Sequence, residues 1–146
     1  MAESEIAARV MRYLARQVEW LETGLRLLDH FEERLEDAAL DRFADEQRRR
    51  EAELDHLVRE HRGLLREWRE AKDVTESERA NINRLAERVR GLTGQLMARH
   101  ERAQVLVSQR LAGRDAALGT LERGRELLER YRPGGEESSW MLDKRA

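Results

Sequence analysis

The chain has 146 residues, of which 40% are charged, 40% are hydrophobic and only 5% are aromatic, and its net charge is −2. This balance excludes a global field that would favour nucleic acid or an anionic membrane, and the absence of cysteine excludes disulfides and thiolate metal sites. A composition rich in Leu, Ala, Glu and Arg is typical of long helices and coiled coils, so we expect an all-α fold with a thin apolar seam.

The first predicted helix covers about residues 3–36. Its apolar residues recur at steps of three or four, which places them on one face of an α-helix. These residues are Ile6, Val10, Leu14, Val18, Leu21, Leu25, Leu28, Phe31 and Leu35. The N-terminus lacks the apolar stretch of a secretory signal, and no run in the chain approaches the roughly 20 apolar residues that a membrane span needs.

The second predicted helix covers about residues 40–71 and follows a break at 36–41, where Asp37 or Asp41 can cap it. No glycine or proline enforces a turn there, so the alternative is that the first two helices run together. The steps of its seam are close to the 3.5-residue repeat of a left-handed coiled coil. The seam consists of Leu40, Phe43, Gln47, Arg50, Leu54, Leu57, His61, Leu64 and Trp68.

The third predicted helix begins at a capping box, in which Thr75 and Glu78 satisfy each other's backbone N–H groups. It covers about residues 76–130 and would span roughly 80 Å. Its first half packs on the other two helices, and we expect its second half to project beyond them. The main stripe consists of Ile82, Leu85, Val89, Leu92, Leu96, Ala103, Leu106, Arg110, Ala117, Leu121, Leu128 and Tyr131.

The projecting half combines weak helix propensity with extra apolar surface. Gly113, Gly119 and Gly124 each cost about 1 kcal/mol relative to alanine in a helix. A second apolar row accompanies the main stripe and consists of Val105, Val107, Leu111, Leu118 and Leu127. This pattern favours an external partner, and the alternatives are a homodimer and a bundle that folds back on itself.

The predicted bundle ends at residue 132. Pro133-Gly134-Gly135 stops the helix, and the polar residues after it predict a flexible tail over 133–146. In this tail Trp140 either docks on the bundle or meets a partner. The predicted architecture is therefore an elongated, antiparallel three-helix bundle or coiled coil with a long C-terminal helix and a tail.

Signatures of catalysis and of metal or cofactor binding are missing from the sequence. Glu53 and His56 have the spacing of di-iron ligands, but no second copy exists and the seam places both outside. His61 lies on the seam and is interpreted as a hydrogen-bonded core or edge residue. The triplet 48–50 is basic, but acids surround it and indicate a solvated face. We therefore expect no enzyme activity, cofactor, metal or nucleic-acid partner.

The layout resembles flagellar type III export chaperones of the FlgN type. The likeness rests on the arrangement of three helices with the longest last, and on four stretches: residues 20–29 (WLETGLRLLD), 35–43 (LEDAALDRF), 117–121 (ALGTL) with 131–135 (YRPGG), and 141–145 (MLDKR). The asparagine-rich lead-in to the last helix that many members show is poorly matched, because Asn81 and Asn83 lie early.

The resemblance implies a cytoplasmic chaperone that covers the C-terminal amphipathic helix of hook–filament junction proteins and delivers them to the export gate. It places client contact at Val107, Leu111, Leu118, Leu121 and Leu128. It also implies that Tyr131 contacts the export gate. The competing functions are a self-associating coiled-coil scaffold or adaptor and a metal-binding helical bundle.

Overall fold

The computed structural model describes residues 4–110 and 114–131, and these fold almost entirely into helices without a strand. The helices are α1 (Glu5–Glu33), α2 (Asp37–Glu60), α3 (Leu64–Glu70), α4 (Glu76–Arg110) and α5 (Arg114–Tyr131). The predicted all-α fold is thus confirmed. Within the described ranges, no helix is both long enough and apolar enough to cross a membrane.

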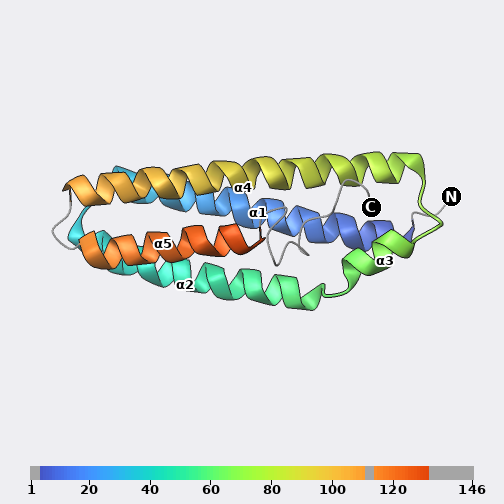
Figure 1. The fold of residues 1–146 in the computed structure, drawn as a ribbon, viewed down its shortest axis with the longest axis horizontal. Coiled ribbons are helices and arrows are strands. Elements are labelled where there is room, and N and C mark those ends of the chain that lie inside the picture. The colour runs from blue at the N-terminus through green and yellow to red at the C-terminus, as the bar shows by residue number, and fades with distance from the viewer. Residues whose placement is uncertain (1–3, 111–113, 132–146) are drawn as a thin grey trace.

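Four long helices lie side by side in an elongated bundle, and the short α3 lies at one end (Figure 1). The helix α1 packs most closely against α4, and α4 against α5, while α2 keeps fewer close contacts with its neighbours α1 and α5. The stacked rings of Phe31 and Phe43 and of Tyr13 and His61 show that α1 and α2 are antiparallel. The backbone of α2 is therefore spaced more widely from its neighbours, although the seam residues of α2 are buried.

Local chemistry explains where α1 and α4 begin. The Ser4 hydroxyl accepts the N–H of Ala7 at the start of α1. The predicted capping box is confirmed at α4: the Thr75 N–H donates to Glu78 Oε1 (3.0 Å), and the Glu78 N–H donates to Thr75 Oγ1 (3.1 Å). Glu78 Oε2 also accepts the Ser4 N–H at 3.0 Å, so the first residues of the two helices are joined.

The second predicted helix is interrupted by a turn at residues 61–63. Gly63 adopts φ = +87°, a left-handed conformation that residues with a Cβ rarely take, and α3 starts directly after it. The break predicted before α2 is present, but its cap differs from the prediction. Glu36 is the N-cap and forms no side-chain capping bond, so neither Asp37 nor Asp41 has the predicted role.

The third predicted helix is two helices, and the expected projecting half is wrong. After α4 ends at Arg110, α5 returns antiparallel along α4 rather than extending the rod (Figure 1). The physical reason is burial: the reversal places the apolar row of α5 against α4 instead of in water. The structure therefore matches the alternative of a bundle that folds back on itself.

The predicted seams form the core. Seam residues from every helix are buried, including Leu14, Leu21, Leu28, Leu54, Leu64, Ile82, Leu96, Leu121 and Leu128. The helical periodicity of the sequence therefore identified which faces turn inward. The predicted tail over 133–146 lies outside the described residues.

Candidate functional site

The predicted client-binding residues lie in the protein's own core. Val107, Leu121 and Leu128 are almost completely buried, and Leu118 is half-buried against the same core. Leu111 lies outside the described residues. For the four described residues the expectation of an open helix face is wrong, because α4 and α5 cover each other.

Tyr131 is also held inside the bundle. The ring is buried, and the phenol donates a hydrogen bond to Asp55 Oδ1 at 3.2 Å. In this conformation the residue joins the end of α5 to α2, and contact with an export gate would require it to leave that position. Among the described residues, Val105 is the exposed large hydrophobic side chain, with 56% of its surface accessible.

The surface between α1 and α2 offers a more open site. Three cavities follow one another along this face, with volumes of about 270, 510 and 250 Å³. The first and second share Arg16 and Glu60. The third follows the second directly on α1, at Leu27, and one turn away on α2, at Glu46. We call this surface, from Arg9 on α1 to the C-cap Arg34 and from Ala39 to Glu60 on α2, the α1/α2 groove. It is about 38 Å long at the rise of an α-helix.

The floor of the groove is apolar at two places. Trp20 and Leu57 line the central cavity, and the stacked rings of Phe31 and Phe43 line the end cavity together with Leu27. These side chains are mostly buried and already belong to the core. A guest side chain entering either cavity would therefore meet a preformed apolar surface.

The two walls of the groove differ in charge. The α1 wall carries one acid, Glu19, and five arginines: Arg9, Arg12, Arg16, Arg26 and Arg34. The α2 wall carries one exposed arginine, Arg42, and three acids: Glu46, Glu53 and Glu60. Arg16 reaches across to Glu60 at 3.7 Å, and both side chains are about half exposed. Exposed pairs of this kind contribute little to stability, so a charged partner can replace them.

A layer of polar side chains crosses the core beside the central cavity. Gln47 and Arg50 come from α2 and His100 comes from α4, and all three are buried. Two glycines make room for them: a Cβ at Gly24 would overlap the Arg50 guanidinium, and one at Gly124 would lie 2.5 Å from His100 Cε1 and 2.7 Å from Gln47 Nε2. The four long helices thus meet at one level around polar groups instead of leucine.

The polar layer is electrostatically costly. Burial lowers the pKa of Arg50 to about 10, an effect that Glu53 and Glu46 oppose, and the guanidinium remains protonated at neutral pH. Burial, together with the charge of Arg50, lowers the pKa of His100 to about 4, so its imidazole is neutral. Arg50 Nη1 and His100 Nδ1 are both buried without a hydrogen-bond partner among the described residues. An unmatched buried polar group is destabilising unless something else satisfies it.

Trp20 connects the polar layer to the groove. The Arg50 guanidinium carbon lies 4.0 Å from the centroid of the indole ring, and the indole N–H donates to the Arg50 carbonyl at 3.0 Å. Both residues line the central cavity. The buried cation therefore lies next to space that a ligand can enter.

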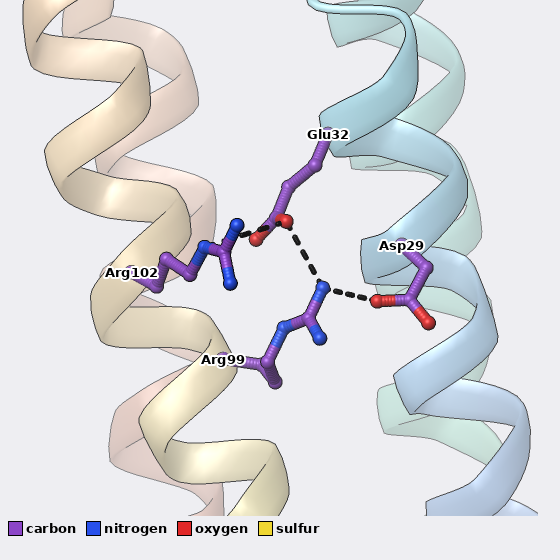
Figure 2. A network of polar contacts seen from close by, with 4 residues as sticks. All are labelled: Asp29, Glu32, Arg99 and Arg102. Carbon is purple, nitrogen blue, oxygen red and sulfur yellow. Dashed lines mark hydrogen bonds and ion pairs between the residues drawn. The ribbon is translucent and has the colours of Figure 1, made fainter.

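The opposite side of α1 is fastened to α4 by ion pairs (Figure 2). Arg99 pairs with Asp29 and with Glu32, the latter at 2.9 Å, and Arg102 lies 3.7 Å from the same Glu32 carboxylate. The side chain of Glu32 is only 10% exposed, which limits screening by solvent. This network fixes to α4 the side of α1 that lies opposite the groove.

The histidines do not gather into a ligand cluster in the part of the chain that the structure describes. Glu53 and His56 are exposed on α2, and the described part of the chain contains no group of three or more potential ligands. His61 has the predicted seam role, because its ring stacks on Tyr13 and Nδ1 lies 2.9 Å from the Leu57 carbonyl.

Sequence reasoning missed the α1/α2 groove, and it missed that Gly24 and Gly124 make room for the polar layer. The available signal was the pair of polar residues, Gln47 and Arg50, at seam positions of α2. Comparison with protein-family models, with curated proteins and with solved structures finds no match for this chain.

Proposed function

We propose that this protein binds an amphipathic helix of a partner protein in the α1/α2 groove. The specific form of this proposal is a cytoplasmic flagellar export chaperone that holds the C-terminal helix of hook–filament junction proteins and hands it to the type III export gate. The observation that supports it is the groove itself, a row of three cavities with apolar hollows and charged walls between α1 and α2.

Helix-in-groove recognition accounts for the parts of the site. Apolar side chains about three helical turns apart on the guest helix, or roughly 16 Å, would enter the hollows over Trp20 and over the Phe31–Phe43 pair. The polar edges of the guest helix would remain at the walls. A groove of about 38 Å accommodates roughly seven turns of helix. Covering such a helix keeps its apolar face out of water, which is how a chaperone prevents aggregation of a client before export.

The residues to which the resemblance assigns client contact have an indirect role in this proposal. Val107, Leu121 and Leu128 build the core that supports the groove, so replacing them would unfold the bundle rather than remove a contact. Variants that test client binding must instead change the groove surface. Thr23 is suitable because it is exposed, lies on α1 and lines the central cavity.

The experiment measures binding of C-terminal segments of junction proteins to the full chain by calorimetry, with helicity followed by circular dichroism. We expect a one-to-one complex, and we expect Thr23→Tyr to weaken it about tenfold or more by filling the central cavity. Ser108→Tyr, an equally large change at an exposed position of α4 outside the groove, is the matched control and should bind normally.

Two results would remove the proposal. One is failure of every such segment to bind the folded chain. The other is a stable homodimer whose interface covers the α1/α2 groove, which analytical ultracentrifugation combined with Thr23→Tyr would reveal, and which favours the scaffold function instead.

A further inference from the structure

Arg50 is a buried cation for which the described residues provide no counter-ion. It is 5% exposed, and no carboxylate among the described residues lies within ion-pair distance of its guanidinium. Its acidic neighbours on α2, Glu46 and Glu53, act on it only at longer range. A buried charge without a partner is destabilising, whereas replacing it with an apolar group of similar volume is often neutral or stabilising. Structural support of the bundle therefore does not explain this arginine.

The surroundings of the guanidinium hold it in one place. Nη2 packs against the backbone of Gly24, where even a Cβ would collide, and the planar group lies over the Trp20 ring. Nη1 is buried and has no hydrogen-bond partner among the described residues. A guanidinium immobilised in this way can donate to an anion without further loss of side-chain freedom, because its conformation is already fixed.

The anion can arrive through the groove. Arg50 and Trp20 line the central cavity of about 510 Å³, which opens between the two helices. The rim of this cavity carries Arg16 and Arg26 from α1, so an acidic group meets positive charge along its path. A carboxylate matches the planar guanidinium better than any other side-chain group, since it accepts two parallel N–H bonds.

We propose that the partner helix carries one acidic side chain within its apolar face, and that this carboxylate enters the central cavity and binds Arg50. The inference rests on the proposed function, because it concerns the partner of the same groove. It makes Arg50 the residue that selects the register and identity of the partner: a helix with only apolar residues at this level leaves the cation unmatched. Such selection by a buried polar group is the established use of polar residues at seams between helices.

The first test uses two designed helical peptides of about 25 residues, long enough to occupy the groove. Both have a leucine face, and they differ at one central position of that face, which is Glu in one and Gln in the other. We expect the full chain to bind the Glu peptide about tenfold or more tightly than the Gln peptide, the difference expected for a buried charge-assisted contact. Equal affinities, or no binding of either peptide, overturn the inference.

The second test uses Arg50→Met, which removes the charge and keeps most of the side-chain volume. We expect this variant to lose the preference for the Glu peptide while its urea midpoint stays the same or rises. A residue that merely supports the fold would lower both binding and stability together. Arg48→Met is the control, since it removes an exposed arginine of α2 that lies outside the groove and should keep the preference.

The two proposals can fail separately. If segments of junction proteins bind but acidic and neutral peptides are not distinguished, the groove binds helices and Arg50 is not the selector. If the Glu peptide is preferred but no junction segment binds, the site is a helix receptor for another partner. Should Arg50→Met fail to fold, the comparison of the two peptides on the unmodified chain still decides, and Arg50→Lys tests whether a positive charge without the planar fork suffices.

Discussion

Acidification should destabilise the bundle through His100, because its imidazole is buried as the neutral form. The ring is 2% exposed and lies close to Gly124 and Arg50. Its pKa shift comes from burial and from the positive charge of Arg50, and no carboxylate opposes it. Its pKa is lowered to about 4 in the folded chain from an ordinary value of 6.5. Between these two pH values the unfolded chain therefore binds more protons than the folded chain. The stability that neutral His100 permits is complete above pH 6.5 and is lost as the pH falls towards about 4.

The size of the effect follows from the two pKa values. Between about pH 7.5 and about pH 4.5, differential protonation of this one group lowers the free energy of unfolding by about 2.5 kcal/mol. For a chain of this length, that corresponds to a decrease in Tm of roughly 8 °C. Carboxylates also titrate in this range, so the effect must be separated from theirs by substitution.

The assay is urea unfolding at both pH values, followed by circular dichroism, for the unmodified chain, His100→Gln and His56→Gln. His100→Gln should lose about 2.5 kcal/mol less on acidification than the unmodified chain, because glutamine cannot take up the proton. His56 is exposed, and its substitution should leave the acid-induced loss unchanged. An identical loss in His100→Gln and the unmodified chain would refute the argument that burial keeps this imidazole neutral.

Three further predictions concern stability and can be checked by the same urea unfolding at neutral pH. Gly24→Ala should destabilise the bundle by about 1–3 kcal/mol because the new methyl displaces the Arg50 guanidinium, whereas Gly94→Ala, which has open space around it, should stabilise it by about 0.5–1 kcal/mol; the same sign for both would contradict the packing described. Thr75→Ala should cost about 1 kcal/mol through loss of the α4 cap, and Thr75→Ser should restore most of it. Glu32→Gln should cost about 1–2 kcal/mol by leaving Arg99 with a single carboxylate, and an unchanged midpoint would show that the network does not fasten α1 to α4.

The sequence was a good guide to the faces of the helices and a poor guide to their connections. The steps of three and four residues correctly placed Leu14, Leu54 and Leu96 inside, since the period of a helix does not depend on its neighbours. The same period continues across a reversal of the chain. It therefore could not separate α4 from α5, whose burial depends on contacts between residues far apart in sequence.

The candidate site was hidden for a related reason. Gln47 and Arg50 were placed on the seam correctly, but their importance depends on Gly24 and Gly124, which reach the same level only when four helices are in register. Glycine by itself signals weak helix propensity, and nothing local shows that it also makes room for a guanidinium. The α1/α2 groove likewise depends on the spacing of two helices, which periodicity does not determine.

The place where α5 ends has a practical consequence for anyone who attaches something to this protein. Because α5 runs back only part of the way and Tyr131 is tied to Asp55 on α2, α5 ends on the flank of the rod and not at a tip (Figure 1). A fluorescent domain fused directly to Tyr131 would stand beside α2 and compete for room with whatever approaches that side. Labels joined ahead of Ser4, at one end of the rod, would leave the flank clear.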